Sequence, residues 1–326
     1  PCLVIAGAGS GKTKVLTHKI AYLISEKNVK PYNILAITFT NKAASEMKQR
    51  VEKIVGDVAQ EMWMGTFHSI CVRILRRFID RIGFDTSFLI FDTSDQKTVV
   101  KECLKALNID DKTFSDRSVL SEISNAKNEM LTPKAYQAKY SGEFRKEKIG
   151  QVYELYQKRL RENNAIDFDD IINYTIDILS ENPDVLQYYT EKFKYVLVDE
   201  YQDTNKAQFT LVTILASRYG NITVVGDNDQ GIYSFRGADI SNILNFEKDF
   251  PGTKIIKLEQ NYRCTGNILK AANAVIKHNE NKYEKKLWTE NEEGSLPCLY
   301  QAEDEYDEAN YIVKQIEHLK TEEYLK

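Results

Sequence analysis

The 326-residue chain contains few of the features that mark metal, disulfide or membrane proteins. Its five cysteines are scattered and never occur in a C-x-x-C spacing, so we expect neither a zinc site nor a disulfide framework. The four histidines show no ligand spacing either. No apolar run approaches the length of a membrane span. We therefore expect a cytoplasmic protein without a membrane partner.

The sequence also lacks an excess of basic residues. It has 44 lysines and arginines against 48 aspartates and glutamates, which gives a net charge of −4. This balance excludes a basic sleeve around nucleic acid, so any such contact must come from a local groove aided by stacking. The length predicts two or three structural units. No signal peptide is visible, and because Pro1 rather than methionine stands first, we expect the chain to belong to a longer polypeptide.

A glycine-rich segment is the most informative feature of the sequence. It has the sequence AGAGSGKT, follows the apolar run of residues 3–5 and precedes a helical pattern that begins near Lys14. Glycines let the backbone curl so that successive N–H groups point at phosphate oxygens, which a helix N-terminus also attracts. Lys12 is expected to reach the β- and γ-phosphates of a nucleotide, and the Thr13 hydroxyl to bind Mg²⁺. The predicted loop residues are Ala6, Gly7, Ala8, Gly9, Ser10, Gly11, Lys12 and Thr13.

This segment departs from the strict pattern at Ala6, and on its own it leaves open a glycine-rich turn that binds nothing. A pair of acids supplies the second half of the site. Residues 195–198 form an apolar, β-branched run that predicts a buried strand, and Asp199 and Glu200 follow directly. Asp199 is expected to hold Mg²⁺, directly or through water, and Glu200 to orient and deprotonate the attacking water. The loop and the acid pair together predict a nucleoside triphosphatase.

Strands and helices alternate over the first 90 residues, which predicts a parallel sheet with helices on both faces. From residue 92 to 189 the sequence is charged, helix-patterned and nearly free of β-branched runs, so we expect an inserted helical subdomain. Strands then resume near residues 195 and 222. A further strand at 254–258, a helix at 267–278, a strand at 297–300 and a helix at 305–320 predict the start of a second α/β unit. The expected domains are 1–91 with 190–253, 92–189, and 254–326.

Polar and aromatic residues follow three of the predicted strands. Because the carboxyl ends of parallel strands lie on one edge of a sheet, we expect these residues to form a track that stacks nucleobases and binds phosphate. A helix N-cap is the alternative for Thr40 or Asn41. Gln230 could in addition sense the γ-phosphate or the attacking water. The expected track residues are Phe39, Thr40, Asn41, Thr66, His68, Tyr233, Phe235 and Arg236.

Arg263 follows the strand at 254–258, on the predicted second unit. Read alone it is a surface residue. Beside a triphosphatase site, an arginine from a neighbouring domain is a recurring device for stabilising charge on the γ-phosphate in the transition state. We therefore expect Arg263 to act as an arginine finger that couples the state of the nucleotide to domain closure.

Six motifs, in this order, resemble those of superfamily 1 DNA helicases of the UvrD/Rep/PcrA kind. They are AGAGSGKT, ITFTNKAASEMKQRV, GTFHSICVRILRR, LVDEYQDTNKAQ, VVGDNDQGIYSFRGADI and LEQNYRCTGNIL. The resemblance implies a P-loop NTPase with a RecA-like parallel sheet, an inserted helical subdomain and the start of a second RecA-like domain. It implies an ATPase centre made of Lys12, Thr13, Asp199, Glu200, Gln230 and Arg263. It also implies that Tyr262 stacks on adenine and that the track residues contact single-stranded DNA.

The chain departs from that family in several places. Lys14 stands where many relatives carry an arginine that packs on the adenine, Phe235 where they often have tryptophan, and Gly231 where serine is common. The upstream glutamine motif and the last two helicase motifs are missing from the sequence, so we expect a fragment of a longer helicase.

The resemblance implies an ATP-dependent 3′→5′ DNA helicase and single-stranded DNA translocase that uses ATP and Mg²⁺. Its expected partners are single-stranded DNA, junctions of single- and double-stranded DNA, and repair or replication proteins. Two alternatives share every motif. One is an ATP-gated, single-strand-binding motor that displaces proteins without processive unwinding, and the other is the helicase part of a helicase–nuclease. The sequence does not identify the pathway.

Overall fold

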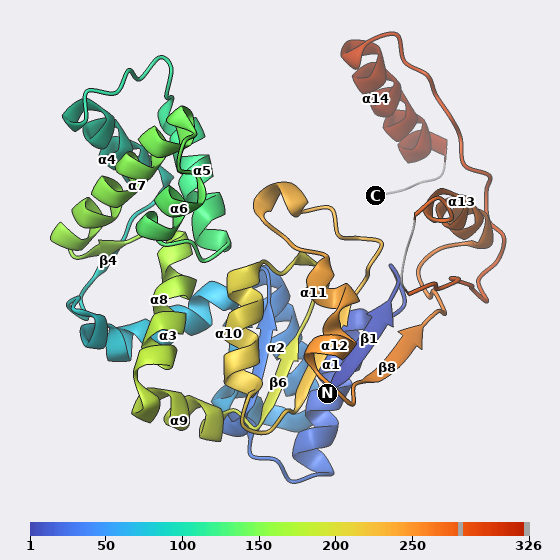
Figure 1. The fold of residues 1–326 in the computed structure, drawn as a ribbon. Helices are drawn as coiled ribbons and strands as arrows, with labels where there is room; N and C mark the ends of the chain where they lie inside the picture. The colour runs from blue at the N-terminus through green and yellow to red at the C-terminus, as the bar shows by residue number, and fades with distance from the viewer. Residues whose placement is uncertain (280–282, 323–326) are drawn as a thin grey trace.

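The computed structural model describes residues 1–279 and 283–322 and has a six-stranded parallel sheet at its centre (Figure 1). The strand order is β3-β2-β6-β7-β1-β8, so the chain crosses over repeatedly. The strands are β1 (Cys2–Ala6), β2 (Ile34–Thr38), β3 (Trp63–Thr66), β6 (Tyr195–Val198), β7 (Ile222–Gly226) and β8 (Lys254–Leu258). This arrangement confirms the predicted α/β class with a parallel sheet.

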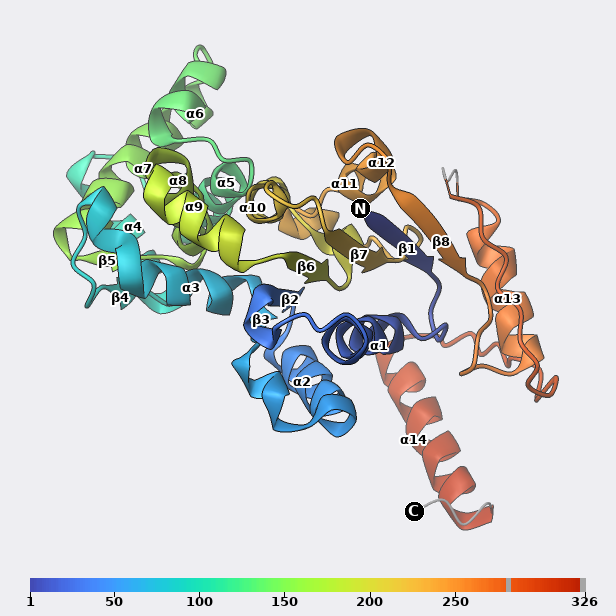
Figure 2. The same ribbon diagram turned by 90° about the horizontal axis from the view of Figure 1, so that it is seen from below.

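Helices cover both faces of the sheet, so that the inner strands β2 and β7 are buried along their whole length. In β1, Leu3 and Ile5 pack into one hydrophobic core and Val4 and Ala6 into another, as the alternation of a strand requires. Helices α1 (Lys12–Ser25) and α2 (Asn41–Val55) cover one face. The other face is covered by α3 (Phe67–Phe78), α8 (Phe168–Glu181), α9 (Pro183–Lys192) and α10 (Lys206–Ala216). Figure 2 shows α1 and α2 on the opposite side of the sheet from α10.

A helical subdomain with its own core interrupts the sheet domain (Figure 1). It contains α4 (Thr93–Ala106), α5 (Asp116–Asn128), α6 (Pro133–Lys139) and α7 (Phe144–Glu162). The chain enters along β4 (Leu89–Ile90) and leaves along β5 (Ala165–Ile166), and these two strands pair in parallel. The core of the subdomain extends from Val99 to Ala165.

The predicted subdomain of residues 92–189 also includes helices α8 and α9, and its limits stay a prediction. Helices α8 and α9 pack into the core of the sheet domain through residues such as Ile172, Leu179 and Tyr189. Ile166, one residue after the end of the subdomain core, already belongs to the core beneath the sheet. The sequence pattern indicated helices here, but it carried no information on which core they cover.

The C-terminal part differs from the prediction at two places. The strand at 254–258 was expected to begin a second sheet, but β8 instead pairs with β1, with Ala6 opposite Leu258, as the edge strand of the first sheet. β1 offered an open edge beside it, which the local sequence cannot reveal. Residues 297–300, predicted to form a strand, are irregular. The division at residue 254 otherwise stays a prediction.

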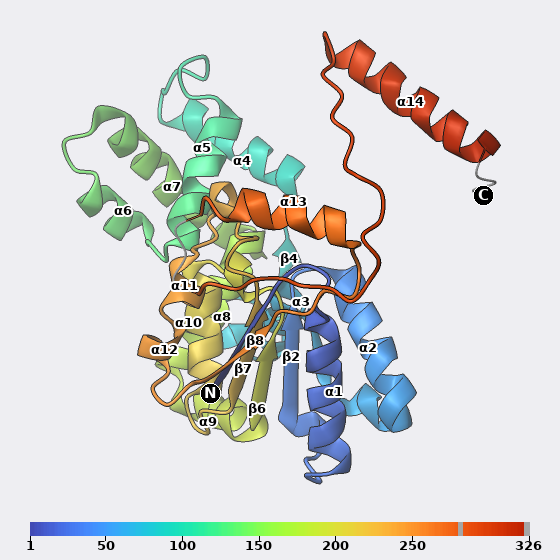
Figure 3. The same ribbon diagram turned by 90° about the vertical axis from the view of Figure 1, so that its right-hand side faces the viewer.

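The remaining helices are short or lie towards the C-terminus. They are α11 (Ser241–Leu244), α12 (Phe246–Asp249), α13 (Gly266–Ile276) and α14 (Glu305–Glu322). Figure 3 shows α13 beyond the carboxyl ends of the strands and α14 extending away from the sheet. Among the described residues, no helix combines the length and apolar character needed to cross a membrane.

Candidate functional site

The glycine-rich loop connects β1 to α1, which begins at Lys12, two residues before the predicted start. Ser10 closes the loop because its backbone N–H and its hydroxyl both donate to the carbonyl oxygen of Gly7, at 3.3 and 2.7 Å. Gly9 and Gly11 adopt φ angles of 71° and 92°, which residues with a side chain rarely tolerate. No side chain in the described part of the chain caps α1. The loop therefore presents backbone N–H groups to an anion.

The predicted acid pair lies directly opposite this loop. The Nζ atom of Lys12 is 2.7 Å from Oε2 of Glu200 and 3.4 Å from Oε1 of Gln230. The Thr13 hydroxyl lies 3.5 Å from Oδ2 of Asp199. Side chains from three separate segments thus meet at one point on the carboxyl edge of the sheet.

The acid pair is electrostatically and conformationally strained. Burial, together with the charge of the neighbouring Glu200, raises the pKa of Asp199 to about 6. Glu200 has φ 49° and ψ 43°, in the left-handed region that a non-glycine residue rarely occupies. Asp199 supports this turn by accepting the backbone N–H of Glu200 at 3.0 Å. A cation beside Asp199 would favour its charged form, so the carboxylate fits a metal position.

Gln202 links the ends of β6 and β7, a role that the sequence analysis did not assign. Its amide donates to Oε2 of Glu200 at 2.9 Å and accepts the backbone N–H of Asp227 at 3.0 Å. Asp227 in turn accepts from the side-chain amide of Gln230 at 2.6 Å. A side chain at Gly226 would collide with Gln202, since an added Cβ would lie 2.7 Å from its Oε1 atom. The two strand ends therefore form one hydrogen-bonded unit.

The turn after β8 lies on the glycine-rich loop. Asn261, another residue without an assigned role in the sequence analysis, donates to the carbonyl oxygen of Ala8 at 2.7 Å. The backbone N–H of Tyr262 donates to the carbonyl oxygen of Gly9 at 3.0 Å, and a Cβ on Gly9 would lie 2.8 Å from Cβ of Arg263. The side chains of Tyr262 and Arg263 are exposed beside the loop, as is that of Lys14 on α1. All three therefore border the predicted nucleotide site.

A cavity of about 640 Å³ adjoins the acid pair and contains part of the predicted DNA track. Phe39, Thr40 and Tyr233 line it together with Glu200 and Gln230. The Thr40 hydroxyl caps α2 by accepting the backbone N–H of Ala43 at 3.1 Å, and Asn41 is the first residue of that helix. The N-cap alternative thus explains Thr40 structurally, while Phe39 and Tyr233 connect the predicted nucleotide site to the rest of the predicted track.

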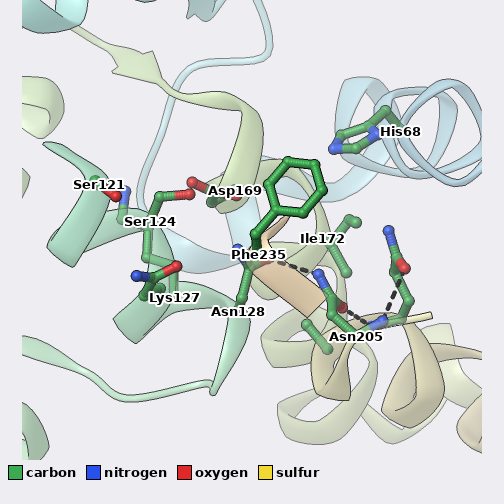
Figure 4. A pocket seen from close by; sticks show the side chains of 12 residues that line it. His68, Ser121, Ser124, Lys127, Asn128, Asp169, Ile172, Asn205 and Phe235 are labelled. Atoms are coloured by element: carbon green, nitrogen blue, oxygen red, sulfur yellow. Dashed lines mark hydrogen bonds between the residues drawn. The ribbon is translucent and has the colours of Figure 1, made fainter. Parts of the chain in front are cut away.

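A second cavity of about 350 Å³ lies between the sheet domain and the helical subdomain (Figure 4). Figure 4 shows the Phe235 ring between His68 and polar side chains of α5, such as Ser124 and Asn128. Phe235 is 73% exposed, and its ring centroid is 6.0 Å from that of Tyr233. Burial lowers the pKa of His68, so its ring is neutral at pH 7. The cavity therefore offers aromatic faces and uncharged hydrogen-bonding groups, and the ionisable side chains of Lys127 and Asp169 also line it.

Thr66 and Arg236 are the remaining residues of the predicted track, and Phe168 lies beside His68. The Thr66 hydroxyl accepts the backbone N–H of Ser69 at 3.2 Å and caps α3, so its structural role is clear. The exposed ring of Phe168, which the sequence analysis missed, packs edge-on against His68 at 5.9 Å. The side chain of Arg236 lies outside the described part of the chain.

Comparison with protein families identifies the family of this chain. The family profile for the UvrD/REP helicase N-terminal domain matches residues 1–251, and that for the UvrD-like helicase C-terminal domain matches residues 256–326. The chain belongs to the UvrD/REP helicase family. The predicted family and the P-loop NTPase class with a RecA-like sheet are thereby confirmed, while the roles of individual residues stay predictions.

Curated relatives within the UvrD/REP family are close in sequence. The chain is 58% identical over 316 residues to the ATP-dependent DNA helicase PcrA of Staphylococcus epidermidis, and 56% identical to that of Staphylococcus aureus. Each match covers 97% of this chain but 43% of the relative. The chain thus spans less than half the length of these helicases.

Proposed function

We propose that this chain is part of an ATP-dependent 3′→5′ DNA helicase and translocase. The observation that carries the proposal is the meeting of Lys12, Glu200 and Gln230 at one sheet edge, beside a cavity lined by aromatic residues. Names of relatives at 56–58% identity support DNA as the substrate. The 3′→5′ direction is taken from the resemblance to the family.

ATP and Mg²⁺ fit the residues present. The curled loop with its uncapped helix N-terminus is suited to a triphosphate. Thr13 and Asp199 would hold Mg²⁺, which usually takes one or two protein ligands and completes its shell with water and phosphate oxygens. Bound there, Mg²⁺ would neutralise charge on the phosphate oxygens. Within the described residues no group of three or more acids, histidines or cysteines forms an all-protein metal site.

The ion pair between Lys12 and Glu200 suggests how these residues act in turn. A triphosphate in the loop competes for the Lys12 amine, which then leaves Oε2 of Glu200. Glu200 is thereby released to accept a proton from water, while Gln202 keeps hold of the same carboxylate. Gln230 lies within reach of the same point and connects through Asp227 to the end of β7. Arg263, at the rim of the loop, is proposed to act on the γ-phosphate.

DNA is proposed to lie across the strand ends, on Phe39, Tyr233, Phe235 and the ring of His68. Junctions of single- and double-stranded DNA, and repair or replication proteins, are the proposed further partners. Domain closure around ATP would shift the stacked bases, because Gln230 and Tyr233 lie on one short segment. A strand-displacement assay on the full-length protein distinguishes a helicase from a motor that only displaces bound proteins.

The acid pair supplies the direct test. In the full-length protein, Lys12→Ala and Glu200→Gln should both abolish ATP hydrolysis, and Glu200→Gln should still bind ATP because Glu200 acts on water. Glu46→Gln, which alters an exposed carboxylate on α2, is the matched control and should hydrolyse ATP normally. Turnover near the wild-type rate in Glu200→Gln would refute the assignment of Glu200 as the base.

A further inference from the structure

A buried lysine holds the segment that carries Gln230. The side chain of Lys285 is 4% exposed, and its Nζ atom lies 2.6 Å from Oδ1 of Asp227 and 3.2 Å from Oδ1 of Asn228. It also pairs with Asp229, whose side chain is 7% exposed. Lys285 is more than 50 positions away in the sequence from these three residues, and the sequence analysis assigned it no role. One ammonium group therefore binds three consecutive side chains of the turn after β7.

The two oxygens of Asp227 face different partners. Oδ1 accepts from Lys285 and from the backbone N–H of Asp229, and Oδ2 accepts from the side-chain amide of Gln230 at 2.6 Å. Because a carboxylate can only accept hydrogen bonds, it must be met by the NH₂ end of Gln230. The Oε1 end of Gln230 is thereby turned towards Lys12, at 3.4 Å.

The backbone on which Lys285 lies is itself fixed against the nucleotide site. The N–H of Trp288 donates to the carbonyl oxygen of Glu259, and the N–H of Asn261 donates to that of Trp288. Leu287 fills the space beside Gly7, where an added Cβ would lie 2.5 Å from its side chain. The same short stretch thus contacts the glycine-rich loop and the turn that holds Gln230.

We propose that Lys285 is a positioning residue for ATP hydrolysis, which orients Gln230 through Asp227. The inference rests on the proposed role of Gln230 at the γ-phosphate. Removing the cation that pairs with two buried carboxylates leaves their charge without compensation, so the turn must open or rearrange. Lys285 lies in the stretch that matches the C-terminal helicase domain, whereas Gln230 lies in the stretch that matches the N-terminal one. Lys285 would therefore make hydrolysis depend on contact between the two.

The experiment compares Lys285→Met with Lys286→Met, which removes the same charge from the exposed neighbouring residue. In the full-length protein, Lys285→Met should lower kcat for ATP by about 100-fold, the effect of misplacing a reacting group by about 1 Å. The Kd for ATP should remain within about two-fold, because Gln230 contributes to hydrolysis more than to binding. Lys285→Arg should keep part of the wild-type kcat, and the control Lys286→Met should keep all of it.

Two further measurements separate positioning from general damage. Without nucleotide, amide hydrogen exchange in residues 227–237 should be faster in Lys285→Met than in Lys286→Met. In a Gln230→Ala background, Lys285→Met should cause no further loss of kcat, because the two residues act as one unit. Equal exchange in the two lysine variants, or additive losses in the double variant, would overturn the proposal. A wild-type protein without ATPase activity would refute the proposed function, and the exchange comparison would then decide the role of Lys285.

Discussion

Lys127 and Lys285 have almost the same surroundings but lie in different parts of the molecule. Each side chain is at most 4% exposed and pairs with two aspartates. The aspartates of Lys127 begin α8, where Asp167 and Asp170 form a capping box. Those of Lys285 follow β7 and lead to Gln230. The same electrostatic arrangement therefore holds the start of α8 in one region. In the other region, as proposed, it orients Gln230.

The Lys127 cluster connects the helical subdomain to the sheet domain. Lys127 lies at the end of α5, 2.6 Å from Oδ2 of Asp167 and 2.8 Å from Oδ1 of Asp170. Tyr156 of α7 donates to the same Asp167 oxygen at 2.9 Å. The cluster thus fastens two subdomain helices to α8, directly beside the cavity that contains Phe235. Its expected role is the placement of the proposed DNA track rather than of the residues at the proposed nucleotide site.

The largest effect is expected when the ammonium group of Lys127 is removed. Lys127→Met should lower the free energy of unfolding by about 3–5 kcal/mol, because it leaves the buried Asp167 carboxylate, and Asp170 beside it, without their cation. Lys139→Met is the control, since Lys139 forms an exposed pair with Glu129 and should contribute about 1 kcal/mol or less. Urea denaturation measures both. At low denaturant the folded Lys127→Met protein should keep its DNA-independent ATPase rate, which is the opposite of the result expected for Lys285→Met. Equal losses of stability in the two variants would show that the buried Lys127 cluster contributes nothing beyond a surface pair.

The sequence predicted that the glycine-rich loop and the acid pair meet, whereas it predicted neither lysine cluster. The glycine-rich loop and the acid pair are local patterns that consist of adjacent residues, such as Lys12 with Thr13 or Asp199 with Glu200, so they can be recognised in the sequence. Parallel strands then brought the patterns together without further information. Lys127 and Lys285 gave no such signal, because a lone lysine in a charged segment looks the same whether it is buried or exposed.

The edge position of β8 and the packing of α8 and α9 were missed for a related reason. Periodicity shows that a segment forms a strand or a helix, but a free sheet edge or an open core decides where it lies. Thr40 and Thr66 illustrate a further limit. Their hydroxyls follow strands, as DNA-binding hydroxyls would, yet both cap the following helix. From sequence alone, a cap and a ligand contact look identical.

A second prediction distinguishes the cavity beside Lys127 from the acid pair by its effect on DNA binding. Phe235→Ala should weaken single-stranded DNA binding by roughly 1–3 kcal/mol, as the loss of a base–aromatic stack does. The loss should vary little with salt, because no phosphate contact is removed. DNA-stimulated ATPase should fall while the basal rate persists, since Phe235 lies in the cavity beside Lys127 and not at the acid pair. Phe144→Ala, which removes an equally exposed ring on the far subdomain, is the control. Unchanged affinity in Phe235→Ala would remove the central contact of the proposed track.

The smallest expected effect concerns protons in the Lys127 cluster. One ammonium group balances one carboxylate, and burial together with Asp167 raises the pKa of Asp170 to about 7. In the unfolded chain this pKa lies near 3.9. Between these values the folded protein holds a proton that the unfolded chain has released, so this group's stabilising contribution falls as the pH rises.

From pH 6 to pH 7 this contribution should fall by about 1 kcal/mol. Asp170→Asn imitates the protonated acid and can still accept the backbone N–H of Asp167, so its stability should lack this decline. Urea denaturation at the two pH values measures the difference between wild type and variant, which cancels the contributions of other titrating groups. Asp184→Asn, at an exposed carboxylate, should follow the wild type. If the stability of Asp170→Asn also falls as the wild type's does, both carboxylates beside Lys127 are ionised from pH 6 to pH 7. The Lys127 cluster would then carry a net negative charge between the two domains, and Lys127→Met should destabilise it more at pH 7 than the estimate above.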